Sequence, residues 1–466
     1  MNLHQSMDTP SIKLESLTLK PHVIEEVLYF LFFLSASWDI FGKIVVAGYS
    51  FRFFYLLELI LFLLLLCKEL KSGFSLSLFV GHIYFFIWMF FIALWMPNTT
   101  VLVRNVGYFF WMCFSCLLLI LLCSSLKTGD KALKYFKLYL ISYFFMAIFG
   151  VCQFLVGLLG ISLKTTQWWI YGVVPRVNGL CYEPSYFGTY LAGGAVLLYW
   201  LTFVKRKKLL KHQTVMVIFV IASTVLTSSR IAILTLFFTT LLHLLVELFY
   251  PLLVKGKIRL SGVKLLGVQV LFVILIILTL WFYFPSTKVF LSGTGLGGTS
   301  SHSVSQRLQE MRDTFLVFLK NPIIGVSLGG IPSHRASLYG KTITTQLEAK
   351  KFEGMNVFVE VLAASGIIGY IFFILFWFDL IYFHYKLSKK IKTYLENNKR
   401  KFSIFLELKS VSDSLGIMIV AEVFALTMNQ NILRPYFWLS LAFYMTFLKT
   451  LKRELKNENC NRCEDD

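Results

Sequence analysis

Charged residues are scarce in this chain. Asp, Glu, Lys and Arg make up 15% of its 466 residues, whereas hydrophobic residues make up 57%, and phenylalanine alone occurs 47 times. A soluble domain has about 25% charged residues, and a disordered chain has few aromatic ones. Such a composition excludes a disordered protein and an ordinary soluble enzyme, because polar groups must cover the surface of a soluble protein. It predicts a polytopic membrane protein.

Cysteine is too sparse and too scattered to define a disulfide scaffold or a zinc site. Five of the eight cysteines lie in apolar runs, where the thiol behaves as a small hydrophobic group. The pair Cys460-x-x-Cys463 has no second half-site, although zinc needs about four converging ligands. The predicted outer segments also contain no clustered carboxylate pair that would suit Mg²⁺. We therefore predict no metal and no cofactor.

Acidic residues are few as well, 25 against 45 basic ones, which gives a net charge of +20. Excess positive charge in a soluble protein favours a nucleic-acid partner, but in a membrane protein it gathers in cytoplasmic loops. We expect a lipid bilayer and no nucleic acid as partner. With both termini in the cytoplasm, 30 of the 45 basic residues fall on the cytoplasmic side, and this bias predicts that orientation.

Runs of about 20 apolar residues predict the membrane-spanning helices. The chain has twelve: 25–45, 51–67, 76–96, 106–126, 137–158, 186–204, 213–228, 231–250, 265–284, 355–383, 411–428 and 434–450. The predicted fold is an all-α, polytopic helical bundle with nine spans over 25–284 and three over 355–450. Cytoplasmic segments are expected at 1–24 and 451–466, the tail being disordered after Lys452.

One long extracytoplasmic loop is expected at 285–354. It opens with a G-x-G-x-x-G spacing in Leu291–Gly298, which follows a predicted span rather than a β-strand. We therefore interpret this segment as a flexible turn and not as a dinucleotide site. Apolar residues at helical spacing over 304–320 predict an amphipathic helix on the membrane surface, ended by Asn321-Pro322.

Polar side chains near the outer face are the candidate functional residues, because a charge at membrane depth is costly. They are Arg176 and Glu183 in one segment, Arg230 between two spans, Arg307 and Arg312 on the loop helix, His334, Asn356 and Arg434. Arginine suits phosphate, since its planar donors hold two oxygens at once. The spacing of Glu353, Asn356 and Glu360 places them on one helical face.

Structural interpretations of the same residues stay open at this point. Arg176 and Glu183 could form an ion pair that only stabilises the fold. Arg230 could extend its charge to the membrane interface. The arginines of the loop helix could face lipid headgroups, and Arg434 could lie in an ordinary surface loop.

Four short segments keep a fixed order between about residues 170 and 370. They read R-V-N-G-L-x-x-E-P-S-x-F-G, L-T-x-S-R, R-L-x-x-x-x-D-T-F-x-x-F-x-x-N-P-I-I-G-V-x-L-G-G and N-x-F-V-E-x-L-A-x-x-G-I-I-G. Together they resemble the O-antigen ligase/polymerase family, which consists of bacterial membrane glycosyltransferases of the metal-independent GT-C type.

The resemblance implies transfer of a glycan from an undecaprenyl-diphosphate carrier at the outer face of the bacterial inner (cytoplasmic) membrane. Arg176, Arg230 and Arg307 match the family's outer-face arginines and would bind the diphosphate. Glu183 matches the acid of the E-P-S segment and is a candidate base or a group that orients the acceptor. Ligases usually carry a His just before the Asn of the last segment, where this chain has Met355. This departure favours a polymerase, and His334 is a candidate substitute for that His.

We therefore predict a repeat-unit polymerase that makes an O-antigen, a capsule or an exopolysaccharide. Glu183 and Arg230 are the predicted catalytic residues, and the predicted substrate-binding residues are Arg176, Arg307, Arg312, Asn356, Arg434 and His334. Lipid-linked glycans and a chain-length regulator protein would be its partners. The alternatives are a ligase that acts on lipid A core or on a protein, and a flippase or exporter of lipid-linked glycans. The sequence has neither the inverted repeats nor the broken helices expected of a transporter.

Overall fold

The computed structural model of the protein describes residues 21–46, 49–72, 78, 81–93, 99–170, 174–246, 263, 267, 270, 274, 301–354, 356–397, 403–428 and 432–465. In this part of the chain there are fourteen α-helices: α1 Pro21–Ser35, α2 Phe53–Ser72, α3 His82–Ala93, α4 Leu102–Ser125, α5 Gly129–Leu158, α6 Pro184–Tyr199, α7 Gln213–Leu226, α8 Arg230–Leu244, α12 Ser301–Lys320, α13 Ile331–Ser337, α14 Gln346–Ala349, α15 Val357–Asn397, α16 Ser403–Leu426 and α17 Pro435–Asp465.

Short elements join some of these helices. The π-helical turn η2 (Trp200–Val204) continues α6, and the 3-10 turn η5 (Lys350–Phe352) continues α14. Two small antiparallel ribbons complete the described secondary structure. Strand β1 (Ile44–Val46) pairs with β2 (Tyr49–Phe51), and β3 (Gln167–Ile170) pairs with β4 (Val174–Arg176).

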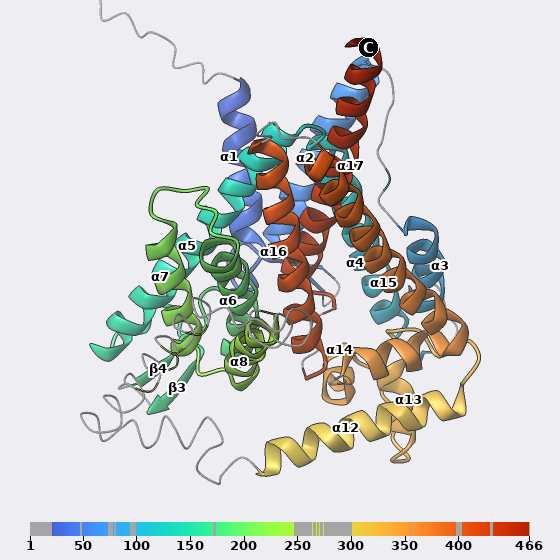
Figure 1. Cartoon of the computed structure of the whole chain (residues 1–466). Coiled ribbons are helices and arrows are strands. Elements are labelled where there is room, and N and C mark those ends of the chain that lie inside the picture. Colours follow the sequence, from blue (N-terminus) through green and yellow to red (C-terminus); the bar gives the residue numbers. More distant parts are fainter. Residues whose placement is uncertain are drawn as a thin grey trace, which may run out of the picture.

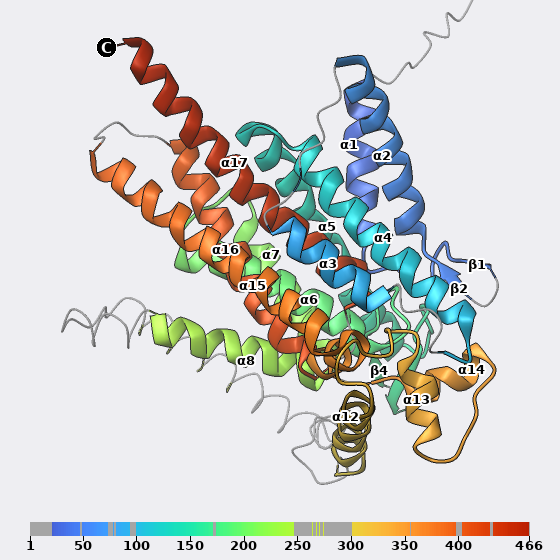
Figure 2. The same ribbon diagram turned by 90° about the vertical axis from the view of Figure 1, so that its right-hand side faces the viewer.

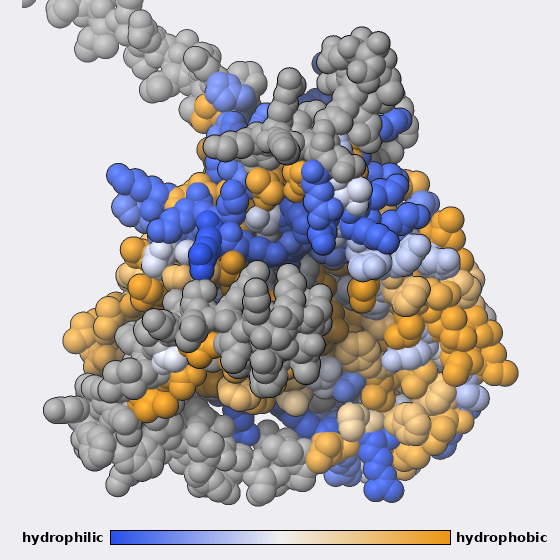
Figure 3. Space-filling view, viewed as in Figure 1, coloured by the Kyte–Doolittle hydropathy of each residue, from blue (hydrophilic) through white to orange (hydrophobic). Residues whose placement is uncertain are grey.

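Most of the long helices run side by side as a bundle, whereas α12 lies across its lower end (Figure 1). The start of α1 and the end of α17 lie at the same, upper end of the bundle, whereas α12, α13, α14 and the β3–β4 ribbon lie at the lower end (Figure 1). Figure 2 shows the same separation after a quarter turn. Hydrophilic residues gather around the upper end and apolar ones cover much of the flank in Figure 3.

Four described helical segments are long and apolar enough to cross a membrane: Leu102–Ser125, Gly129–Leu158, Pro184–Val204 and Val357–Glu396. Shorter apolar helices lie at His82–Ile92, Gln213–Leu226 and Arg230–Leu244. The protein is therefore a polytopic, all-α membrane protein. The count of twelve spans stays a prediction, since the span expected at 265–284 is described only at residues 267, 270 and 274. The glycine-rich segment at 291–298 lies outside the described residues.

Local sequence explains several helix ends. Pro184 occupies the first turn of α6, where its missing N–H costs nothing and its fixed φ suits the helix. The Ser229 side chain accepts a hydrogen bond from the Ala232 N–H, 3.4 Å away, and so caps α8. Helix α12 ends at Lys320, directly before Asn321-Pro322 as predicted.

Two predicted boundaries are wrong. Helix α1 ends at Ser35 rather than near residue 45, because the chain turns there and then enters the β1–β2 ribbon. Helix α17 continues to Asp465, where disorder was expected after Lys452. The residues that follow Lys452 are rich in Glu, Lys and Arg, which are good helix formers, so a polar helix can extend past the apolar span.

Helix α15 is broken at Gly366, where φ is +62° and ψ is −172°. The segment 322–328 fills the break. The N–H groups of Val326 and Ser327 donate to the carbonyls of Ala363 and Ala364 at 3.0 and 2.8 Å. In return, the N–H of Ile367 donates to the Pro322 carbonyl at 2.8 Å. The freed backbone groups of a membrane helix are thus satisfied by protein, which the apolar phase requires.

Candidate functional site

Every predicted site residue whose surroundings are described lies at one end of the bundle. Glu183, Arg230, Asn356 and Arg434 stand at the first turns of α6, α8, α15 and α17. Arg176 lies in β4, Arg307 and Arg312 on α12 and His334 on α13, and these elements lie at the lower end of the bundle in Figure 1. Segments far apart in the sequence therefore lie together at one end of the bundle. The start of α1 lies at the other end (Figure 1).

Arg176 connects two of the four short sequence segments: it begins R-V-N-G-L-x-x-E-P-S-x-F-G and contacts Ser228 in L-T-x-S-R. Its Nη1 donates to Gln167 Oε1 at 2.7 Å across the β3–β4 ribbon, and its Nη2 donates to the Ser228 carbonyl at 3.5 Å. Burial lowers the pKa of Arg176, the negative charge of Glu183 opposes this, and the positive charge of Arg230 adds to it. Arg176 therefore lies close enough to both Glu183 and Arg230 to be influenced by their charges.

Glu183 is the N-cap residue of α6 and is exposed to solvent. Its side chain makes no cap hydrogen bond, and Oε2 accepts a hydrogen bond from the Ser185 hydroxyl at 3.1 Å. A carboxylate at a helix N-terminus is favoured by the helix dipole. Arg230 begins α8 and is half-buried. An accessible acid and a half-buried cation therefore both lie within electrostatic range of Arg176.

Helix α12 carries Arg307 toward the turn between α16 and α17. Arg307 Nη1 donates to the Met428 carbonyl at 3.5 Å. Arg312 is exposed, and within the described residues it has neither a hydrogen bond nor an ion pair. Five residues separate the two arginines, which is about 140° of rotation around an α-helix. The two side chains therefore leave α12 on different faces.

Arg434 lies in a buried ion-pair cluster rather than on a surface loop. Its Nη1 contacts Asp39 Oδ2 at 2.6 Å, and Arg52 Nε contacts Asp39 Oδ1 at 2.9 Å. The Arg434 guanidinium also lies over the Tyr186 ring, 3.6 Å from its centre. Burial alone would raise the pKa of Asp39, but the charges of Arg434 and Arg52 and the N–H of Tyr182 hold it below its usual value.

Asn356 and His334 are engaged with backbone groups. Asn356 Oδ1 accepts from the Val359 N–H at 3.1 Å and so caps α15, while Nδ2 donates to the Thr427 carbonyl at 2.7 Å. His334 is half-buried, and its Nδ1 lies 3.0 Å from the Gly330 carbonyl. Met355, the position where ligases carry a His, lies outside the described residues.

Sequence reasoning missed a buried charge cluster beside these residues. Arg104 on α4 pairs with the Glu353 carboxylate, and Arg335 on α13 binds the Glu353 carbonyl and pairs with Asp313. Glu353 has an extended backbone before α15 begins, so the expectation that it shares a helical face with Asn356 and Glu360 is wrong. An Arg inside the apolar run around 102–125 was the signal that could have identified Arg104.

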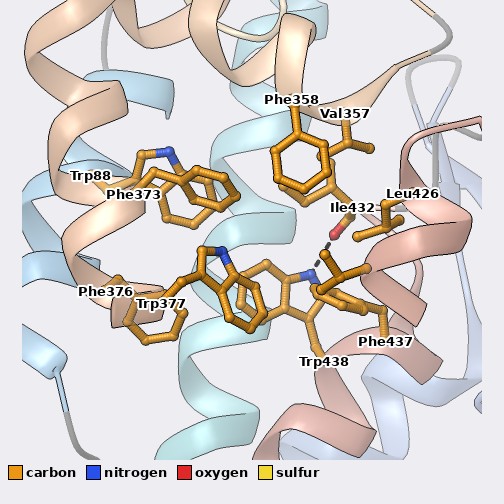
Figure 4. A pocket seen from close by; sticks show the side chains of 11 residues that line it. Trp88, Val357, Phe358, Phe373, Phe376, Trp377, Leu426, Ile432, Phe437 and Trp438 are labelled. Carbon is orange, nitrogen blue, oxygen red and sulfur yellow. Dashed lines mark hydrogen bonds between the residues drawn. The ribbon is translucent and has the colours of Figure 1, made fainter. Parts of the chain in front are cut away.

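A small apolar pocket lies between α3, α15, α16 and α17 (Figure 4). Most of its lining is aromatic, and Trp438 Nε1 donates to the Ile432 carbonyl at 2.5 Å. Val357 and Leu426 place one side of the pocket next to Asn356 and Thr427. Its walls suit an apolar group and not a charged one. Within the described residues, no three His, Cys, Asp or Glu side chains are grouped so that they could hold a metal ion.

Comparison with known proteins identifies one domain. Residues 215–374 match the family model described as O-antigen ligase. The matched range contains Arg230, α12 with Arg307 and Arg312, His334, Asn356 and the break in α15, whereas Arg176, Glu183 and Arg434 lie outside it. A search of curated proteins found no match to this chain.

Proposed function

We propose, from the O-antigen ligase domain at residues 215–374, that this protein is a polymerase of lipid-linked repeat units. It would join oligosaccharides carried on undecaprenyl diphosphate into a surface polysaccharide at the outer face of the bacterial inner (cytoplasmic) membrane. The observation that carries this proposal is the meeting of Arg176, Glu183 and Arg230 at one end of the bundle. These residues come from β4, α6 and α8, only the last of which lies in the matched domain.

The chemistry follows from charge. A hydroxyl of the incoming repeat unit attacks the anomeric carbon of the growing glycan, and a new C–O bond forms. The bond between that carbon and the diphosphate breaks, and its electron pair leaves with the diphosphate. Arg176 and Arg230 stabilise this developing anion, because preorganised cations in a partly desolvated site cost no reorganisation. Glu183 orients the hydroxyl and accepts its proton.

Arg307 would also bind the diphosphate. It reaches the Met428 carbonyl with one nitrogen at 3.5 Å, and its guanidinium has further donors for phosphate oxygens. Arg312, Asn356, Arg434 and His334 remain proposed substrate-binding residues. The contacts of Arg434 with Asp39 and of Asn356 with Thr427 favour a supporting role for these two.

Met355 supports polymerisation over ligation, because the His that ligases usually carry there is missing. The test is a gene deletion with the surface glycan separated on a gel. A polymerase mutant keeps single repeat units attached to their final acceptor and loses the ladder of longer products. A ligase mutant instead accumulates long chains on the lipid carrier. Variants Arg176→Ala, Arg230→Ala and Arg307→Ala should reproduce the polymerase phenotype at normal protein levels, and full ladders from all three would overturn the assignment.

Export of lipid-linked glycans is the second candidate, and the break in α15 favours it, since transporters use discontinuous helices. The sequence prediction that no broken helix is present is therefore wrong. In transporters the freed backbone groups bind the substrate or an ion, whereas here segment 322–328 occupies four of them. Purified protein in detergent separates the two functions, because only a polymerase lengthens lipid-linked glycans without two compartments.

A further inference from the structure

Four charged residues outside the proposed reaction form a connected chain, in which three side chains are buried and that of Glu353 is 28% exposed. Arg104 lies at the start of α4, Glu353 precedes α15, Arg335 lies on α13, and Asp313 lies in the middle of α12. The side chains of Arg104 and Arg335 are 2% and 3% exposed, and that of Asp313 is 11% exposed. Charges removed from water in this way need matched partners.

The first half of the chain is fixed to the membrane bundle. Arg104 Nη2 pairs with the Glu353 carboxylate and also donates to the Tyr108 hydroxyl at 2.6 Å. Arg104 Nη1 donates to Gln346 Oε1 at 3.1 Å. Helix α4 is one of the long apolar spans. Glu353 is therefore held by a rigid element of the bundle.

The second half reaches α12. Arg335 Nη1 donates to the Glu353 carbonyl, and Arg335 Nη2 lies 3.5 Å from Asp313 Oδ2. The Tyr339 hydroxyl donates to the same Asp313 oxygen at 2.7 Å and accepts from Gln309 Nε2 at 3.0 Å. Asp313 thus receives two polar contacts, both from residues at 335–339. No other acid on α12 has an ion pair among the described residues.

These contacts help to fix how α12 is rotated about its own axis. Val317 and Thr314 are buried on one face of α12, whereas Leu308, Phe315 and Leu319 are largely exposed, and apolar contacts have little directional preference. Hydrogen bonds and ion pairs are directional. Asp313 is on the same rigid helix as Arg307, six residues further along, so a contact that fixes Asp313 also fixes the direction in which Arg307 points.

We propose that Asp313 and Arg335 are positioning residues, which set the rotation of α12 so that Arg307 points at the diphosphate of the lipid carrier. This inference rests on the proposed function, because it needs Arg307 to bind that anion. Neither Asp313 nor Arg335 touches the substrate. Their effect passes through Arg307 and concerns substrate affinity more than the rate of bond formation.

The test measures kcat and KM for a lipid-diphosphate-linked repeat unit, with the purified full-length protein. Variants Asp313→Asn, Asp313→Glu and Tyr339→Phe are each made in the wild-type and in the Arg307→Ala background. The matched control is Lys320→Ala, which changes an exposed residue on the same helix.

We expect Asp313→Asn to raise KM about tenfold, a loss of about 1.4 kcal/mol, with kcat within about twofold. Tyr339→Phe keeps the ion pair and should raise KM about twofold, while Asp313→Glu and Lys320→Ala should stay close to wild type.

The Arg307→Ala background distinguishes positioning from general stability. If Asp313 acts through Arg307, the second change adds nothing to the KM of Arg307→Ala, because coupled residues are not additive. The positioning role is overturned if the KM increases of the two single variants multiply in the double variant. It is also overturned if KM is unchanged in both Asp313→Asn and Tyr339→Phe. If Arg307→Ala itself leaves KM unchanged, the use of Arg307 in the proposed function is wrong and the positioning role falls with it. Tyr339→Phe removes one hydroxyl from a half-exposed side chain, so it gives an answer even where Asp313→Asn fails to fold.

Discussion

Arg176 donates a hydrogen bond to the carbonyl of Ser228, 3.5 Å away, and Ser228 has a left-handed backbone with φ of +51°. This conformation is uncommon for a residue other than glycine and ends α7 in a tight turn just before Arg230. The contact ties the β3–β4 ribbon to the α7–α8 turn. Two arginines that are 54 residues apart in the chain therefore share one face.

Replacing Arg176 with Lys should abolish most activity although the charge stays. A lysine has one nitrogen, so it cannot hold Gln167 and the Ser228 carbonyl together and still face an anion. We expect a fall in polymerisation rate of about 10²-fold, the size found when one donor is removed from a preorganised anion site. The rate of ladder formation by purified protein measures it. The control is Lys164→Arg, an exchange of one cation for another at a position ahead of the β3–β4 ribbon, and a lysine variant as active as wild type would contradict the diphosphate role.

Replacing Arg434 with Ala should lower stability before it lowers catalysis. Arg434 contacts Asp39 at 2.6 Å and covers the Tyr186 ring, so its loss weakens the packing of α17 on α1 and α6. Breaking one partner from a buried ion pair costs about 3 kcal/mol. Thermal unfolding in detergent checks this, with the exposed Lys341→Ala as control. A variant with unchanged melting temperature and a raised KM would instead support direct substrate binding by Arg434.

The stabilisation that Asp39 provides should change with pH only at low pH. The pKa of Asp39 is lowered in the folded protein, so its charged form stabilises the fold above the unfolded-state pKa of about 3.9. This contribution is lost as the pH falls through the lower, folded-state pKa. The difference in melting temperature between wild type and Asp39→Asn should therefore be constant from about pH 7 to 5 and shrink below about pH 4. A difference that grows on acidification would show that the two arginines do not hold Asp39 in its charged form.

The sequence predicted helices better than it predicted their interruptions. Pro184 marks the start of α6 because proline suits only the first helical turn, and this rule needs no tertiary information. In the sequence, Gly366 is one of several small residues between 363 and 369, and such residues suit close helix packing. Its role in the fold depends instead on segment 322–328, about 40 residues earlier. Long-range hydrogen bonds of this kind leave no local pattern.

The same reasoning explains which site residues could be predicted. Arginines near the outer ends of spans were recognisable because their charge is costly in apolar surroundings. Their partners were not, since Asp39, Ser228 and Met428 approach them only through the fold. Arg434 therefore resembled a surface residue in sequence, although it is held by Asp39 and Tyr186.

Arg307 and Arg312 should differ in their effect on activity. Both side chains are exposed, but Arg307 faces the α16–α17 turn through Met428, whereas Arg312 leaves α12 on another face. We expect Arg307→Ala to raise KM for the lipid-linked donor about tenfold or more and Arg312→Ala to raise it less than about threefold, the size of a screened surface charge. Steady-state kinetics at two salt concentrations check both values. Equal losses from the two variants would mean that the whole helix surface, and not Arg307, attracts the substrate.

Alanine at Gly325 or at Gly366 should destabilise the protein because two backbone segments cross there. A Cβ on Gly366 would lie 2.3 Å from the Ile323 carbonyl oxygen, and one on Gly325 would lie 2.4 Å from that of Ala364. Both residues also have positive φ, which alone costs about 1–2 kcal/mol for alanine. Gly340 has φ of +66° and open space around its Cβ position, so Gly340→Ala measures the cost of a positive φ without a steric clash.

We expect melting temperatures to fall clearly further for Gly325→Ala and Gly366→Ala than for Gly340→Ala. Equal falls in all three would show that segment 322–328 does not fill the break in α15, and the segment that carries Arg307 would then need another anchor.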